Sequence, residues 1–408
     1  MSTRPTLFDP GRHESLHPVA WDAEAVHTEI QRIVADTENR FDPARLWAAH
    51  PRDRTPAEEA SVGLTPLYHG ACGVIWALHY LSDRGGTTLQ RDYLPFLDAA
   101  RSHNETWLGE VSDQAAPSYM MGDTPFLLMQ WAHAADTGPL EETLAQLMAG
   151  NLDHPFRELM WGSPGSLLAA LFMHGRTGQP RWADLFVQIA SKLWSQLLWS
   201  EEFQCHYWQQ DLYGRPCTYL DAVHGFVATA FVITKGRHLL APRDWLEWER
   251  CIEETVVRTV SEQDGLANWR AQLLTEPGEK PRLLMQFCHG APGFVTCLAQ
   301  FPSSALDALL LRAGEAIWVA GPLIKGANLC HGTGGNGYAF LKLYQRTGNT
   351  LWLERARAFA MHGIAQTRAD QTRYGHGQYS LWTGDLGFAI YLWDCVRGQP
   401  QFPTLDVF

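Results

Sequence analysis

Apolar residues recur at helical spacing in segments of about 13 residues, each preceded by a Gly-x-x-Gly turn and followed by a glycine. One such segment lies between Gly335 and Gly348, and another between Gly165 and Gly178. The spacing predicts helices, because apolar residues three and four positions apart share one face and a glycine commonly ends a helix. Two further helices of this kind are expected between Gly73 and Gly86 and between Pro125 and Gly138.

A second amphipathic segment follows each of these helices, for example at 181–199 and at 350–366. The alternation of apolar and polar residues that predicts strands is almost absent. We therefore expect an all-α chain built of helix pairs, with a short apolar helix and a longer, more polar helix in each pair.

The turn motif recurs along the whole chain, which indicates stacked repeats. Its first glycines stand at positions 70, 122, 162, 225, 290, 332 and 384, at intervals of 52, 40, 63, 65, 42 and 52 residues. Seven helix pairs arranged as an inner and an outer ring, a seven-fold α/α toroid, satisfy this pattern. The alternative is an open α-solenoid, which is less favoured because the middle and end motifs are alike and no polar capping unit is visible.

Composition narrows the function classes. The chain has 408 residues, 46% of them hydrophobic, and a formal charge of −12, which argues against nucleic acid or an anionic membrane as the main partner. No apolar run approaches the roughly 18 residues of a membrane span, and residues 1–10 contain no secretory apolar region. Eight cysteines are too few for a disulfide scaffold. We expect a cytoplasmic chain with one domain over 1–408 and an N-terminal arm at 1–20.

Two residues precede the first glycine of every motif, and these pairs differ in chemistry. They are Tyr68-His69, Met120-Met121, Met160-Trp161, Val223-His224, Cys288-His289, Cys330-His331 and Trp382-Thr383. If the repeats are equivalent in space, all of these side chains gather at one end of the toroid, around its axis. Each inner helix begins there, so that its positive end favours thiolates.

Two of the repeats place cysteine at the same position, which predicts a zinc site. Cys288 and Cys330, with either His331 or His289, form a set of two thiolates and one imidazole with an open fourth position, as in catalytic zinc. The alternative is a pair of buried cysteines beside helix-capping histidines.

Zinc held by two thiolates suits reactions of a substrate thiol, because the metal lowers the thiol pKa without abolishing nucleophilicity. His224 stands at the equivalent position of the fourth repeat and is the candidate general acid–base residue. The alternative for His224 is a polar residue that only starts a helix.

Other catalytic patterns are excluded. The segment Gly332–Gly337 fits a dinucleotide fingerprint but lacks the strand that must precede it. Acidic residues occur only singly in the turns, at Asp123, Asp221 and Asp385, and are expected to cap helices rather than form the carboxylate pair of a glycosidase.

Two segments resemble signatures of the lanthionine synthetase C-like family. They are Phe287-Cys-His-Gly-Ala-Pro-Gly293 and Leu329-Cys-His-Gly-Thr-Gly-Gly-Asn-Gly-Tyr-Ala-Phe340. The resemblance covers essentially the whole chain and implies a seven-fold α/α toroid. It also implies that zinc is held by Cys288, Cys330 and His331, rather than His289.

The same resemblance implies further catalytic residues. His224 lies in Asp221-Ala-Val-His-Gly225, which matches the element that carries the family's acid–base histidine. Glu158, four residues before Gly162, matches an acidic residue of the family.

Two branches of the family compete, and three features are similar to the stand-alone branch that adds glutathione to dehydroamino acids. Lys325 lies ahead of the second zinc cysteine, and Arg373 lies six residues before Tyr379-Ser-Leu-Trp382. Arg4 lies in an element similar to that branch's N-terminal motif, with one extra residue and Asp9 in place of Asn. Together these cations are expected to bind the carboxylates of glutathione; taken singly, each is a solvated surface charge.

The leading hypothesis is therefore a zinc enzyme that joins the glutathione thiol, or a peptide thiol, to a dehydroamino acid in a peptide or protein. One alternative is a lanthipeptide cyclase that forms thioether rings within one peptide. Another is a protein that binds zinc or glutathione without turnover.

Overall fold

Helices with apolar residues on every side form the inner ring of the computed structural model, whose described residues are 7–53, 63–111, 116–275 and 282–408. In Phe226–Lys235, for example, every residue but the last is buried. A helix that is apolar all round is stable only inside a core. The inner helices are α2 (Ala71–Asp83), α4 (Thr124–His133), α6 (Ser163–Thr177), α8 (Phe226–Lys235), α10 (Ala291–Leu298), α12 (Thr333–Thr347) and α14 (Asp385–Arg397).

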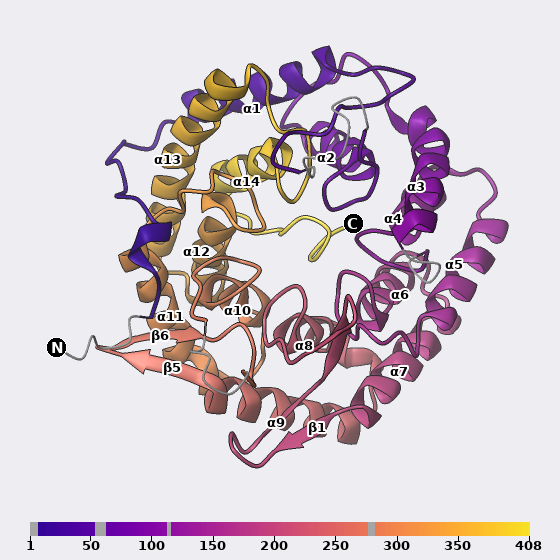
Figure 1. The fold of residues 1–408 in the computed structure, drawn as a ribbon, viewed down its shortest axis with the longest axis vertical. Helices are drawn as coiled ribbons and strands as arrows, with labels where there is room; N and C mark the ends of the chain where they lie inside the picture. Colours follow the sequence, from indigo (N-terminus) through magenta and orange to yellow (C-terminus); the bar gives the residue numbers. More distant parts are fainter. Residues whose placement is uncertain (1–6, 54–62, 112–115, 276–281) are drawn as a thin grey trace.

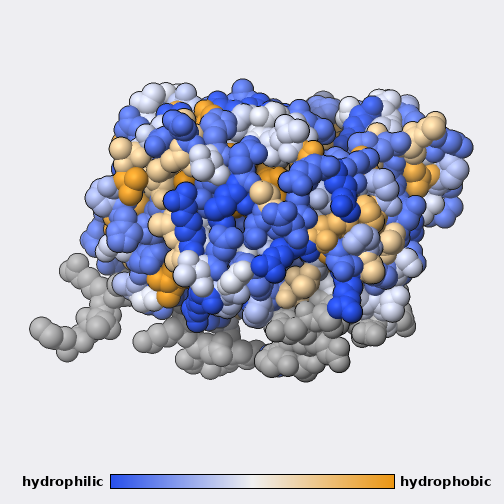
Figure 2. Space-filling model, turned by 90° about the horizontal axis from the view of Figure 1, so that it is seen from above, coloured by the Kyte–Doolittle hydropathy of each residue, from blue (hydrophilic) through white to orange (hydrophobic). Residues whose placement is uncertain are grey.

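The outer helices each bury one face only. In α7 the buried residues are Trp182, Leu185, Phe186, Ile189, Ala190 and Leu193, which is the spacing of a single apolar stripe. The outer ring comprises α1 (Ala23–Asn39), α3 (Leu97–Val111), α5 (Gly138–Gly150), α7 (Pro180–Ser195), α9 (Pro242–Thr259), α11 (Asp307–Ala320) and α13 (Thr350–Tyr374). In side view the outer surface is mostly hydrophilic, with small scattered hydrophobic patches (Figure 2).

The two rings are closed (Figure 1). Each inner helix packs against the next inner helix, and α14 packs against α2 to complete the circle. Each inner helix also packs against the outer helix that follows it in the chain. The last inner helix, α14, packs against the first outer helix, α1. The predicted all-α seven-fold toroid is confirmed, and the open solenoid is excluded.

Three short antiparallel hairpins were not expected from the sequence. They are β1 (Leu198–Ser200) with β2 (Cys205–Tyr207), β3 (Gln210–Leu212) with β4 (Arg215–Cys217), and β5 (Val260–Gln263) with β6 (Leu266–Trp269). They lie between α7 and α8 and between α9 and α10, which are the two longest intervals between repeats. Single 3₁₀ turns occur at η1 (Pro10–Arg12), η2 (Leu94–Phe96), η3 (Arg237–Leu239) and η4 (Ser304–Leu306).

Some predicted helix ends were also wrong. The helix expected to end at Gly138 ends at His133, and Gly138 instead begins α5. The helix expected over 181–199 ends at Ser195, because β1 begins at Leu198, and the helix expected to end near residue 366 continues to Tyr374. The predicted left-handed glycine ends are correct at Gly178 and Gly348, where φ is 65° and 68°.

The second glycine of the turn motif has a packing role. A Cβ atom at Gly293, Gly335 or Gly387 would lie 2.1, 1.8 or 2.0 Å from the carbonyl oxygen six residues earlier. Only a residue without a side chain permits this close approach. The motif therefore recurs because the first turn of each inner helix packs directly against the backbone of the loop that precedes it.

The last residues of the chain lie at the centre of the toroid (Figure 1). Phe402 is fully buried and stacks on Phe287 with 4.4 Å between ring centroids. Asp406 forms an ion pair with the buried Lys342, 2.6 Å apart, from α12. These contacts fill the toroid axis with chain rather than solvent. Within the described residues, no helix combines the length and apolarity needed to cross a membrane.

Candidate active site

Main-chain hydrogen bonds link the turn motifs of successive repeats around the axis. The residues concerned, here called the turn ring, are Tyr68, Met120, Met160, Val223, Cys288, Cys330 and Trp382. The bonds run from Cys288 N to Cys330 O (3.0 Å), Cys330 N to Trp382 O (2.9 Å), Trp382 N to Tyr68 O (3.0 Å), Tyr68 N to Met120 O (3.1 Å), Met120 N to Met160 O (3.1 Å) and Leu159 N to Val223 O (3.1 Å). The predicted equivalence of the repeats therefore holds in space.

The two thiols predicted to bind zinc are neighbours in the turn ring. Both are buried, and neither forms a disulfide. The Tyr68 hydroxyl donates to Cys330 Sγ at 2.9 Å, and Gln286 Nε2 donates to Cys288 Sγ at 2.9 Å. A hydrogen bond to Cys330 and burial raise the pKa of the Cys288 thiol well above its usual range. Such a thiol ionises only when a nearby cation compensates the charge, as a bound dication does.

The imidazoles beside the two cysteines have different surroundings. Burial lowers the pKa of His331, so that it is neutral, as a metal ligand must be. Burial also opposes protonation of His289, but the Asp221 charge outweighs it and raises the pKa. His289 Nδ1 lies 2.6 Å from Asp221 Oδ2. These environments favour His331 over His289 as the imidazole ligand.

The donor types therefore fit zinc, but the structure does not assemble them into a site. Among the described residues, no group of three or more His, Cys, Asp or Glu side chains lies close enough to hold a metal ion. Zinc coordination by Cys288, Cys330 and His331 stays a prediction.

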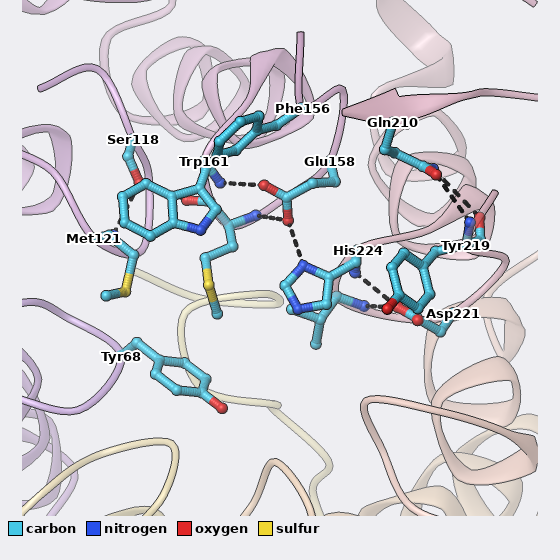
Figure 3. Close-up of polar contacts among 12 residues, drawn as sticks. Tyr68, Ser118, Met121, Phe156, Glu158, Trp161, Gln210, Tyr219, Asp221 and His224 are labelled. Carbon is cyan, nitrogen blue, oxygen red and sulfur yellow. Dashed lines mark hydrogen bonds and ion pairs between the residues drawn. The ribbon is translucent and has the colours of Figure 1, made fainter. Parts of the chain in front are cut away.

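The predicted acid–base residue is paired with the predicted acidic residue. His224 Nδ1 lies 2.9 Å from Oε2 of Glu158, whose carboxylate is fully buried (Figure 3). Glu158 also accepts hydrogen bonds from the main-chain N–H groups of Met160 and Trp161 at 2.9 and 2.6 Å. These bonds fix the carboxylate, which in turn fixes the orientation of the imidazole. Because Nδ1 is engaged by Glu158, Nε2 is the ring nitrogen left for chemistry.

The electrostatics of this pair set the charge of His224. Burial alone disfavours the imidazolium, but the hydrogen bond and charge of Glu158, with the charge of Asp221, raise the pKa of His224 to about 9. The imidazolium is therefore the main form near neutral pH. A protonated histidine held in this way is prepared to donate a proton.

The turn aspartates do not cap helices as expected. Asp123 makes no side-chain capping bond to α4, and Asp385 Oδ2 accepts from Gln378 N at 3.0 Å instead. Asp221 Oδ1 accepts from the N–H groups of Val223 and His224 at 2.9 and 2.7 Å, while its other oxygen faces His289. Asp221 thus belongs to the site rather than to a helix end.

The structure describes two of the three cations predicted to bind glutathione. Lys325 is exposed, five residues before Cys330, and its charge acts on His331. Arg373 is exposed near the C-terminal end of α13, where its guanidinium lies 5.3 Å from the Tyr374 ring centroid. Arg4 lies outside the described residues.

The structure adds residues that sequence reasoning missed. Arg12 donates to Gln286 Oε1 at 3.0 Å, which connects the N-terminal arm to the Cys288 sulfur. Asp53 is partly buried and accepts from Gln378 Nε2 at 2.9 Å, beside the seventh motif. Tyr68 could have been identified, because it occupies the same motif position as both cysteines, whereas the sequence around Arg12, Gln286 and Asp53 contains no signal.

Comparisons with known proteins place these observations in a family. The family model described as "Lanthionine synthetase C-like protein" matches residues 62–407. The chain is 36% identical over 139 residues to glutathione S-transferase LANCL1 of Danio rerio, covering 32% of this chain and 33% of that protein. It is also 36% identical over 136 residues to LanC-like protein GCL1 of Arabidopsis thaliana, covering 30% of each. These matches span about a third of each relative's length.

A solved structure, nisin cyclase, shares the fold. It superposes with a TM-score of 0.64 at 14% identity, covering 92% of this chain and 95% of that one. The family model extends over most of the sequence and includes all seven repeats of the turn motif. The chain is a member of the lanthionine synthetase C-like family.

Proposed function

We propose that this protein adds a thiol, most favourably that of glutathione, to the alkene of a dehydroalanine or dehydrobutyrine residue in a peptide or protein. The observation that carries the proposal is the His224–Glu158 pair, whose imidazole lies within reach of the charge of Cys288. The name of the Danio rerio relative, a glutathione S-transferase, supports the choice of thiol.

The reaction needs a thiolate, a nearby alkene and one proton. The substrate thiol loses its proton, a carbon–sulfur bond forms at the β-carbon, and the α-carbon takes up a proton, so that no oxidant or reductant is consumed. Zinc bound by Cys288, Cys330 and His331 would supply acidification of the substrate thiol. His224, kept protonated by Glu158, is the residue that donates a proton to the α-carbon.

Residues around the cysteines hold this arrangement in place. Tyr68 and Gln286 each donate to one of the sulfurs, and burial and the neighbouring cysteines keep the pKa of the Tyr68 phenol well above its usual range. Tyr68 therefore stays a neutral donor. Lys325 provides a positive charge on the same end of the toroid, which suits an anionic thiol such as glutathione.

The test is mass spectrometry of a dehydroalanine peptide after incubation with zinc-loaded protein and glutathione. We expect the peptide to gain one glutathione, with a much lower yield for His224→Asn. A second peptide containing both cysteine and dehydroalanine tests the cyclase alternative. Loss of its free thiol without a mass change, with no glutathione adduct on the first peptide, would contradict the proposal.

A further inference from the structure

A cavity of about 490 Å³ opens beside His289, between the loops that lead into the fourth and fifth turn motifs. Its walls come from three segments of chain, and the lining residues are Tyr219, Ala271, Gln272, Thr275, Arg282, Leu284 and His289. Main-chain bonds join the three segments, from Leu220 N to Ala271 O at 2.9 Å and from Ala271 N to Arg282 O at 3.1 Å. Two hydrogen bonds therefore tie the three wall segments to one another.

The Tyr219 ring connects this cavity to the catalytic pair. It stacks on His289 with 5.6 Å between centroids and an interplanar angle of 26°. Its centroid lies 5.7 Å from that of His224, beside which Figure 3 shows it. A molecule in the cavity therefore contacts the residues that immediately flank the proton donor.

The cavity and Lys325, one of the cations expected to bind glutathione, belong to loops of different turn motifs. Lys325 belongs to the loop before the sixth motif, next to Ile324, whose N–H donates to Arg12 O at 3.1 Å. The loop that carries Lys325 is therefore joined to the N-terminal arm, whereas the cavity is lined by the loops before the fourth and fifth motifs. Because Tyr219 lines the cavity and lies beside His224, an alkene held in the cavity would lie near the proposed acid.

We propose that this cavity binds the peptide segment that carries the alkene, and that Arg282 selects segments with an acidic residue next to the dehydroamino acid. The inference rests on the proposed function and specifies its electrophilic substrate. Arg282 is exposed and forms no ion pair within the described part of the chain. His289, the other basic residue of the lining, is already paired with Asp221. Arg282 is therefore the charge left to recognise a substrate, in a protein whose net charge is −12.

Binding can be tested without any reaction. Labelled peptides with alanine in place of dehydroalanine, and with Asp, Asn or Lys beside it, are titrated by fluorescence anisotropy. We expect the Asp peptide to bind about 10-fold more tightly than the Lys peptide, the effect of one charge-assisted hydrogen bond. Arg282→Gln should abolish the difference. Arg215→Gln, at an exposed arginine on β4 that does not line the cavity, should retain it.

Steady-state kinetics separates this inference from the proposed function. Arg282→Gln should raise KM for the Asp-flanked dehydroalanine peptide about 10-fold and leave KM for glutathione unchanged. If the parent protein forms the adduct but Arg282→Gln keeps the same peptide preference, the cavity assignment is wrong and the proposed function stands. If the Asp preference in binding is lost in Arg282→Gln but no peptide forms an adduct with the parent, the cavity assignment stands and the proposed function fails.

Discussion

Asp221 bridges the fourth and fifth repeats through His289, with 2.6 Å between Oδ2 and Nδ1. Within the described residues, no main-chain hydrogen bond connects the turn motifs of these two repeats, whereas the other neighbouring motifs of the turn ring are connected in this way. The N–H of Val223 donates to Asp221 Oδ1 at 2.9 Å and not to a main-chain carbonyl of the fifth motif. A carboxylate–imidazole pair thus takes the place of a main-chain contact between the motif of His224 and the motif of Cys288.

The first prediction concerns metal content. Cys288→Ala and Cys330→Ala should lose zinc, because each removes one of two thiolate ligands. His289→Ala should keep it, since that imidazole is engaged by Asp221. Zinc is measured by atomic emission on purified protein, with folding checked by circular dichroism. Full occupancy in Cys330→Ala would rule out the proposed ligand set.

The second prediction concerns pH. Burial opposes protonation of His224, but the bond and charge of Glu158 raise the pKa of His224 to about 9. A proton donor acts in its protonated form, so kcat should be maintained below this pH and fall as pH rises through about 9. In Glu158→Gln the negative charge that raises the pKa of His224 is lost, so kcat should begin to fall at a lower pH. His224→Asn should lower kcat by roughly 10²–10⁴-fold.

Glu202→Gln, at an exposed glutamate remote from the site, serves as the control for these pH profiles. It should keep the parent profile. If kcat falls at the same pH in Glu158→Gln and in the parent, His224 is not the group whose titration causes the fall.

The helical repeats and the turn ring could be predicted from the sequence because they depend on local spacing. Apolar periodicity specifies which face each helix buries, and repetition of the motif places the cysteines and His224 at equivalent positions. Nothing comparable identifies the hairpins, whose strands have three or four residues and are stabilised by the surrounding helices. The end of α4 was missed because Gly138 begins the next helix rather than ending the previous one.

The role of Asp221 could not be derived for a different reason. An acidic residue just before a helix usually caps it, and the local sequence offers no other partner. Its second partner, His289, lies in the next repeat and reaches Asp221 only because the ring closes. The contact of Arg12 with Gln286, beside Cys288, likewise joins segments that are far apart in sequence.

The third prediction concerns glutathione affinity. Lys325→Met and Arg373→Met should each weaken glutathione binding by about 10- to 100-fold, if each cation makes one charge-assisted bond to a carboxylate. A neutral small thiol should be unaffected, because it lacks those carboxylates. Isothermal titration measures both ligands, with Arg243→Met, at an exposed arginine of α9, as control. Parent-like glutathione affinity in both variants would favour the cyclase alternative.

The fourth prediction concerns the motif glycines. In Gly387→Ala the new Cβ would lie 2.0 Å from Leu381 O and 2.7 Å from Leu329 Cδ1, so the free energy of unfolding should fall by about 3 kcal/mol. Gly175→Ala is the control, because its Cβ would meet nothing within 4 Å in the exposed part of α6. This variant should gain about 0.5–1 kcal/mol. Urea denaturation measures both, and equal effects would contradict the packing role.

The fifth prediction concerns the stability of the axis. Burial raises the pKa of Asp394 to about 7, although Gln401 N and the Tyr338 hydroxyl donate to its carboxylate. The folded state therefore binds this proton more tightly than the unfolded state, whose pKa is near 3.9. The stabilisation is present below about pH 4 and is lost as pH rises through about 7.

Asp394→Asn removes this titration. Relative to the parent, the variant should therefore be more stable at about pH 8 than at about pH 5, as measured by urea denaturation at both values. A difference between variant and parent that does not change with pH would show that Asp394 does not titrate in this range.

The turn ring has one more consequence, which concerns how such proteins diverge. Its members are joined by N–H and C=O groups that every residue except proline possesses. A side chain at one of these positions can therefore be replaced without loss of the main-chain bonds that hold the position around the axis. New chemistry can arise by substitution at preformed positions, with no new loop and no change of fold. In this chain the residues at the seven positions are Tyr, Met, Met, Val, Cys, Cys and Trp, so that two thiols occupy neighbouring places of the turn ring.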